Sequence, residues 1–418
     1  MIKGHRELLS YSRVSHLNCY NTFFDRLRTG DWVNRKRLHG YPIIFLFVLA
    51  VTGLIAAGFY HDGLDASGRP LGTDFISFWS ASRLLLQGHP EAAYDHGSLF
   101  AMEQSIGGRD TPLYTWLYPP VALLFVAPLA TLPYLSALYV WIGITLVGYL
   151  TALWRLLPDR RALVPMLAFA PVWINAGHGQ NGFLSGALMG WGLLLLRGHP
   201  WFAGLLMGAL CYKPQLALLI PVALASARLW QALATAAITA FGLVLLSYGI
   251  LGSEVWTAFI AKSDYARQML EEGLVPWQKM TSAFAAIRSV GGSIALAWVI
   301  QGFTGLIAAW AVWQVWRRHT PRRVKAAVLA TGTLLAAPLS LDYDATLFGI
   351  AIAALTAEGL RRGFLDWEKS ALAVAWALPL FWRPVAMATD LSLAPAVLLL
   401  LLWLAVRRAY QFEPDTVA

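Results

Sequence analysis

The chain has 418 residues, of which 58% are hydrophobic and only 13% are charged, whereas about a quarter of the residues of a soluble domain are charged. This composition excludes an ordinary water-soluble globular protein. The formal net charge of +9 does not indicate a nucleic-acid partner, because the basic residues gather at the ends of apolar stretches, as the positive-inside rule describes.

Long uncharged stretches predict membrane-spanning helices. Residues 41–60 and 293–313 each remain uncharged for about the 20 residues that cross a hydrocarbon core. Residues 1–39 are polar and basic, so we expect no cleaved signal peptide and a first span that remains as an anchor. The whole pattern predicts an all-α, polytopic membrane protein with about 12 crossings.

The Lys and Arg residues predict which side of the membrane each segment faces. Basic clusters precede the first span and follow apolar runs at 316–325, 360–364 and 406–410, so these ends should be cytoplasmic. We therefore expect a cytoplasmic segment 1–40, a membrane domain 41–410 with outer loops at 61–117 and 252–292, and a cytoplasmic tail 411–418. Residues 118–176 offer three apolar segments for two allowed crossings, so one of them should enter without crossing.

The first outer loop has the pattern of two amphipathic helices. In residues 74–88, Phe75, Phe78 and Trp79 fall largely on one helical side, with Ser77 and Ser80 elsewhere, and residues 90–108 form a second short apolar and polar pattern. Two such helices are expected to lie flat at the membrane interface, and a solvent-exposed helical hairpin is the alternative.

Three acidic residues in this loop have different expected roles. Asp74 starts the first amphipathic helix in TDFISFW, where it is either an ordinary N-cap or a catalytic carboxylate at the outer boundary of the membrane. Asp65, in the glycine-containing GLDASG, and Asp62, directly before it, are expected to be turn residues.

Lys213 is unusual because it lies within the apolar string GALCYKPQLALLI. A charge between apolar helices is expensive and is by default a functional hypothesis. A lone ammonium there suits a phosphate, while snorkelling to the interface is the alternative. Pro214 is expected to break the span at this point, as happens at sites within the membrane.

Two polar strings supply further candidate residues. The string GHGQN, expected to be a flexible loop, offers His178, Gln180 and Asn181, the donors and acceptors that bind sugar hydroxyls, although helix capping and a structural histidine explain them too. The string SLDYD adds Asp342, Tyr343 and Asp344, which suit a cation or an acceptor hydroxyl, or a cap for the next helix.

No metal, cofactor or disulfide is expected. No His or Cys accompanies the two acids of SLDYD, which argues against a metal. Cys19 and Cys211 should lie in different environments and cannot easily pair. The chain has no GxxxxGK[ST], GxGxxG or HExxH motif in a matching context, so soluble nucleotide-sugar chemistry is not indicated.

An ordered series of strings carries a resemblance to a known family. Residues 73–95, 116–141, 179–188, 203–221 and 337–347 together resemble the GT-C superfamily of membrane glycosyltransferases. The specific resemblance is to glycosyltransferase family 87, the polyprenyl-phosphate-mannose-dependent α-mannosyltransferase type. It implies a GT-C-like helical bundle in a bacterial plasma (inner) membrane, with the active site facing the periplasm or cell exterior.

The resemblance also implies roles for individual residues. In that family an acidic residue of the first outer loop is the general base of a one-step inverting transfer, and Asp74 occupies the matching place. Lys213 would neutralise the departing lipid phosphate. The implied partners are a polyprenyl-phosphate-linked sugar donor, a glycolipid or glycan acceptor, and membrane lipids. Sugar or acceptor contacts are expected from Tyr118, His178, Gln180, Asn181, Gln215, Asp342, Tyr343 and Asp344.

Two other functions fit parts of the pattern. Many spans, a broken helix and a membrane Lys also describe a transporter or a lipid-linked sugar flippase, although the sequence has no convincing internal repeat. A noncatalytic assembly subunit is the third possibility. Replacement of Asp74 discriminates this subunit from an enzyme, because only the enzyme should lose activity.

Overall fold

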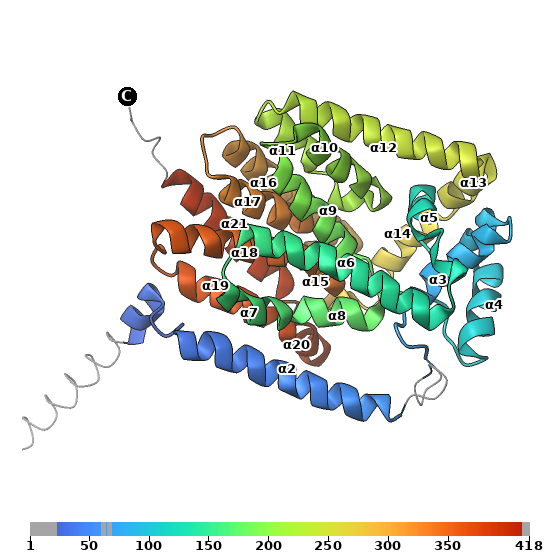
Figure 1. Ribbon diagram of the computed structural model, residues 1–418, viewed down its shortest axis with the longest axis horizontal. Coiled ribbons are helices and arrows are strands. Elements are labelled where there is room, and N and C mark those ends of the chain that lie inside the picture. Colours follow the sequence, from blue (N-terminus) through green and yellow to red (C-terminus); the bar gives the residue numbers. More distant parts are fainter. Residues whose placement is uncertain (1–22, 60–63, 65–68, 412–418) are drawn as a thin grey trace, which may run out of the picture.

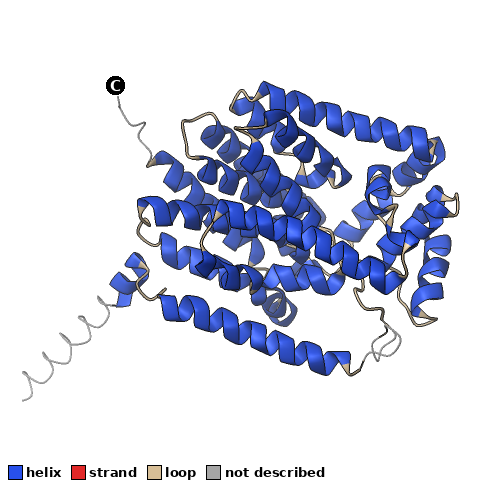
Figure 2. Cartoon of the chain, in the orientation of Figure 1, coloured by secondary structure: helices blue, strands red, loops and turns tan. Residues whose placement is uncertain are grey.

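The computed structural model describes residues 23–59, 64 and 69–411, and the regular secondary structure of these residues is entirely helical (Figures 1 and 2). The predicted all-α class is therefore confirmed. Asp62, Asp65 and Cys19 lie outside the described residues, as does nearly all of the predicted cytoplasmic tail 411–418. Cys211 is a free, partly buried thiol.

Five helices are long and apolar enough to cross a membrane. They are α2 (Arg35–Ala57), α6 (Tyr134–Leu156), α12 (Trp230–Leu251), α16 (Ile294–Trp316), and the continuous pair η7 (Asp342–Ala345) and α18 (Thr346–Arg362). The predicted spans at 41–60 and 293–313 correspond to α2 and α16.

Shorter helices account for the difference from the predicted number of crossings. The pair α19–η8 and α20 passes the same test only as one span bent by 61°. Other apolar helices have 10–17 residues, which at 1.5 Å per residue reach about 15–26 Å, less than a core of about 30 Å. The described residues thus contain five helices that could span a membrane, or six with the bent pair, and the count of about 12 stays a prediction.

The remaining helices are short, and many begin at a residue suited to that position. Pro120 and Pro200 stand at the start of their helices, where the missing N–H costs nothing, and the side chain of Asp95 caps α4 (His96–Gly107) by accepting from the Ser98 N–H. These elements are α3 (Phe75–Leu86), η1 (Pro90–Tyr94), α4 (His96–Gly107), α5 (Pro120–Val126), η2 (Leu129–Thr131), η3 (Arg160–Ala162), α7 (Leu163–Leu167), α8 (Ala170–His178), α9 (Gly182–Leu195), α10 (Pro200–Ala209), η4 (Leu210–Tyr212), η5 (Pro214–Leu216), α11 (Ile220–Ser226), α13 (Ser253–Ala261), α14 (Ser263–Glu271), η6 (Trp277–Lys279), α15 (Ala283–Ser289), α17 (Arg322–Ala336), α19 (Glu368–Ala377), η8 (Leu378–Leu380), α20 (Trp382–Thr389) and α21 (Ala394–Tyr410).

The core is built around α18. Within the most apolar window of this helix, 83% of the residues are buried, against 6% for α2, which runs along the edge of the molecule (Figure 1). Small residues such as Gly349 allow this, because a Cβ at that position would lie 2.3 Å from the Tyr149 hydroxyl. Close packing at small residues is the usual way in which membrane helices associate. α18 therefore holds η7, and with it Asp342–Ala345, in a fixed position.

The first outer loop differs from the predicted pair of interfacial helices. α3 is largely buried on its polar side as well as its apolar side, because Ser77 and Ser80 are 4% and 0% exposed, and Arg83 alone of its polar side is exposed. The second predicted helix is divided into η1 and α4. The expectation that α3 exposes a polar face is therefore wrong, and the placement of the loop at the membrane interface stays a prediction.

The basic clusters predict which segments face the cytoplasm and which face outward, and this prediction can be tested. With Cys19 and Cys211 replaced by Ser, a cysteine at the exposed Asp110 should react with an impermeant thiol reagent in intact cells, whereas one at the exposed His319 should react only after lysis. The labelling ratio before and after lysis is the measurement. Reaction of the His319 site alone in intact cells means that the topology is inverted.

Candidate functional site

Asp74 stands at the start of α3 without acting as a cap. Its side chain makes no capping hydrogen bond, and instead Oδ2 accepts from Gln180 Nε2 at 3.0 Å. The preceding turn is strained, because Thr73 has a φ of +27°, a backbone region that a β-branched residue rarely adopts. The side chain of Asp74 is 29% exposed. A solvent-accessible carboxylate is thus held by a side chain 106 residues away.

His178 lies beside this carboxylate. It ends α8, and its Nδ1 is 2.7 Å from Thr73 Oγ1 and 3.8 Å from Asp74 Oδ1. His178 is partly exposed, so both side chains are open to the same space. The arrangement brings the GHGQN string and the TDFISFW string together.

Residues 179–181 form a tight turn between α8 and α9 and not the flexible loop expected from the sequence. Gly179 has a φ of +60°, and a Cβ there would lie 2.6 Å from Phe75 Cβ, so the backbone packs directly on α3. Gln180 and Asn181 are buried. Asn175, which sequence reasoning missed, braces the turn because its amide donates to the Gln180 carbonyl at 3.1 Å and accepts from the Gly182 N–H at 2.8 Å. The sequence feature that could have indicated this role is the position of Asn175 within the apolar string APVWINAGH.

Lys213 is buried and paired, which corrects two expectations. It lies between η4 and η5, is 3% exposed, and places Nζ 2.5 Å from Asp344 Oδ1 and 3.2 Å from Asn181 Oδ1. Its ammonium also lies 4.8 Å from the centre of the Tyr343 ring, within cation–π range. Lys213 is therefore neither a lone ammonium nor a side chain that snorkels to the interface.

The two acids of SLDYD have separate partners. Asp344 pairs with Lys213, and its second oxygen accepts from the Leu341 N–H at 3.1 Å, which is the capping role considered for this string. Asp342 accepts from Arg383 Nη1 at 3.3 Å. Arg383, on α20, was missed in the sequence because nothing local connects a residue of the C-terminal segment with this site. Its side chain is 30% exposed, which makes it the more accessible cation of the site.

Gln180 and Asn181 join Asp74, Tyr118, Lys213 and Asp344 into one cluster. The Tyr118 hydroxyl donates to Gln180 Oε1 at 3.2 Å, and burial together with the charge of Asp344 raises the pKa of Tyr118, so this hydroxyl keeps its proton. This bond orients the Gln180 amide so that its Nε2 faces Asp74. Asn181 connects to Lys213 and so to Asp344. Gln215 is not joined to the other candidates by a hydrogen bond and donates weakly to the Leu339 carbonyl at 3.5 Å.

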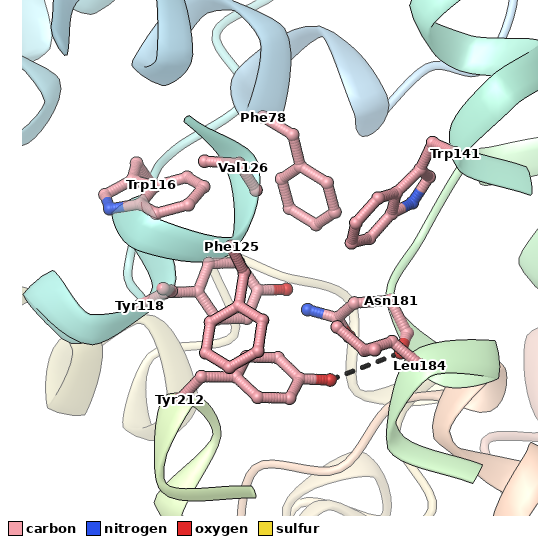
Figure 3. Close-up of a pocket in the computed structure, with 10 residues that line it drawn as sticks. Phe78, Trp116, Tyr118, Phe125, Val126, Trp141, Asn181, Leu184 and Tyr212 are labelled. Carbon is pink, nitrogen blue, oxygen red and sulfur yellow. Dashed lines mark hydrogen bonds between the residues drawn. The ribbon is translucent and has the colours of Figure 1, made fainter. Parts of the chain in front are cut away.

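An aromatic pocket adjoins this cluster (Figure 3). Its volume is about 10 Å³, and it lies between α3, α5, α6 and α9. The Tyr212 hydroxyl donates to the Asn181 carbonyl at 3.3 Å and lies 2.5 Å from Ser185 Oγ. About one water fits such a volume, so the pocket itself has no room for a sugar and its aromatic side chains form one wall of the site. Its lining is Phe78, Trp116, Tyr118, Ala122, Phe125, Val126, Trp141, Asn181, Leu184 and Tyr212.

The long apolar helices and a polar cluster enclosed among them define a helical membrane protein with a candidate active site. The sequence model of glycosyltransferase family 87 matches residues 116–338. The chain belongs to this family and is a glycosyltransferase. No curated protein and no solved structure matches the chain.

The matched region contains only part of the cluster. Tyr118, His178, Gln180, Asn181, Lys213 and Gln215 lie within residues 116–338. Asp74 and Asp344 lie outside it and reach the cluster through hydrogen bonds with Gln180 and Lys213. Asp342 also lies outside the matched region and is bonded to Arg383.

Proposed function

We propose that this glycosyltransferase transfers a hexose, with mannose as the first candidate, from a polyprenyl-phosphate donor to a lipid or glycan acceptor. The reaction takes place on the outer face of a bacterial plasma membrane, with Asp74 as the general base. The observation that carries the proposal is the Asp74 carboxylate, which is accessible, free of a capping role and held by Gln180. A base must be positioned and open to its substrate, and both conditions favour this residue.

The proposed reaction is a single displacement. Asp74 accepts the proton of an acceptor hydroxyl, the hydroxyl oxygen forms a bond to the anomeric carbon, and the bond from that carbon to the phosphate oxygen breaks. The electron pair leaves with the lipid phosphate, and the configuration of the sugar inverts. The enclosed donors and acceptors of Gln180, Asn181 and Tyr118 suit the hydroxyls of the sugar.

The proposed reaction also requires positive charge beside the phosphate of the lipid donor. Lys213 is the proposed donor-phosphate ligand, but its pairing with Asp344 means that its ammonium must turn partly from that carboxylate to reach an anion. Arg383 offers a second cation, held by Asp342 and more exposed. Cations near the departing phosphate stabilise the charge that develops in the transition state.

Transfer from a defined donor tests the function. Purified protein in liposomes, given polyprenyl-phosphate-[³H]mannose and the lipid extract of the source membranes, should move the label onto a lipid or glycan acceptor. The matching glucose and N-acetylglucosamine donors test the choice of sugar. Movement of intact labelled donor across the bilayer without transfer would instead identify a flippase and overturn the proposal.

A further inference from the structure

A large apolar cavity lies between α2 and the rest of the molecule, away from the Asp74 site. Its volume is about 620 Å³, within the range of small-molecule and lipid pockets. The walls come from α2, the end of α6, α7, α18 and α19, and include Met166, Phe169 and Trp376. α3 and α4 lie at the opposite end of the molecule (Figure 1). The cavity is therefore separate from the proposed active site.

The weak packing of α2 explains the cavity. This helix has 6% of its most apolar window buried, and Phe47 and Leu54 are 68% and 76% exposed. Figure 1 shows it running beside α7 and α19 at the edge of the molecule. In a bilayer an apolar gap of this kind is filled by hydrocarbon and not by water, because its lining offers water few partners.

The rim of the cavity is basic. Arg35 and Arg37 on α2, Arg161 on η3 and Lys369 on α19 line it together with one acid, Asp159, which gives four positive charges against one negative charge. In the part of the chain that the structure describes, none of these four basic side chains forms an ion pair within 4.0 Å. Asp159 is already engaged, because its carboxylate accepts from the Arg161 N–H at 2.9 Å.

The position of the rim matches the predicted cytoplasmic side. Arg35 lies at the start of the first span, Arg161 follows the end of α6, and Lys369 follows the Arg361 and Arg362 cluster at the end of α18. Anionic headgroups are concentrated at this leaflet, and basic pockets between helices bind them. The charge of the rim and the apolar interior thus select the same amphipathic ligand.

We propose that this cavity binds one anionic bilayer phospholipid of the cytoplasmic leaflet, with its phosphate at Arg35, Arg161 and Lys369 and its acyl chains between α2 and α7–α19. The lipid takes the place of the protein packing that α2 lacks. The site is distinct from the proposed donor site on the opposite side, so binding there does not depend on the proposed reaction.

Binding of phosphatidylglycerol to the purified full-length chain tests the proposal. Native mass spectrometry and titration in detergent should give wild type at least tenfold tighter binding of phosphatidylglycerol than of phosphatidylcholine. The triple variant Arg35→Gln, Arg161→Gln, Lys369→Gln should lose on the order of a hundredfold, because each basic residue near an anionic headgroup contributes about fivefold.

Two further variants separate the cavity from general surface charge. Lys36→Gln, Arg197→Gln, Arg317→Gln removes the same charge from exposed positions outside the cavity and should keep the preference. Ala373→Phe fills the apolar interior without changing charge and should weaken binding. An unchanged preference in the triple variant, or equal loss in the surface control, overturns the proposal. Displacement of phosphatidylglycerol by undecaprenyl phosphate overturns it as well, since the occupant is then the sugar carrier.

Discussion

Replacing Asp74 with Asn should leave the fold intact and lower sugar transfer by at least about a hundredfold. A general base contributes about 10² to 10⁴ in rate, and an amide does not accept the acceptor's proton at neutral pH. The fold should survive because the amide oxygen of the substituted side chain can still accept from Gln180 Nε2, the one side-chain bond that the structure gives Asp74 Oδ2. Transfer of labelled sugar and melting temperature in detergent are the two measurements.

Two controls complete this comparison. Asp110→Asn removes an exposed carboxylate of the same predicted loop and should retain both transfer and stability. Asp74→Ala should lose transfer, with little of the roughly 1 kcal/mol that loss of an N-cap costs, because no cap is present. Transfer within a few-fold of wild type in Asp74→Asn would exclude the base. Asp342 or Asp344 would then be the next candidate; both carboxylates are buried, Asp342 beside Arg383 and Asp344 against Lys213.

The contribution of the Lys213–Asp344 ion pair to stability should become visible when the melting temperatures of single and double variants are compared. Lys213→Met alone leaves the Asp344 carboxylate buried without its partner, which costs about 3–5 kcal/mol in soluble proteins. Lys213→Met with Asp344→Asn removes both charges, and the amide oxygen that replaces the carboxylate can still accept from the Leu341 N–H. Most of the stability should therefore return.

Activity then separates the two roles of Lys213. The double variant should stay inactive and should bind a polyprenyl-phosphate analogue weakly, since the positive charge is absent. Lys213→Arg keeps the charge with altered geometry and should bind the analogue better than Lys213→Ala does. If transfer returns together with stability in the double variant, Lys213 has a structural role and Arg383 becomes the candidate phosphate ligand.

The sequence predicted those features that depend on local composition. Uniform apolarity over about 20 residues is sufficient to recognise α2 and α16, whatever surrounds them. Short helices such as α10 and α11 are different, because their apolar residues fit a crossing, a re-entrant segment or a buried core equally well. The number of crossings therefore cannot be derived from these segments alone.

Features that depend on distant partners could not be predicted in the same way. Asp74 occupies the position of an N-cap in the sequence. Its carboxylate does not cap the helix, because it accepts a hydrogen bond from Gln180, which is 106 residues away in sequence but adjacent in the fold. The amphipathic pattern of α3 was misleading for a related reason, since Ser77 and Ser80 on its polar side are buried by the rest of the fold. Arg383 had no recognisable context before α20 was placed against η7.

The Lys213–Asp344 ion pair also constrains the order in which the chain can fold during synthesis. Lys213 and Asp344 are 131 residues apart, so at about 5–20 residues per second Lys213 leaves the ribosome on the order of 10 s before its partner. During that interval the segment from α10 to α11 carries an unneutralised charge that disfavours its burial among apolar helices. The segment should therefore reach its final packing only after η7 and α18 have been made.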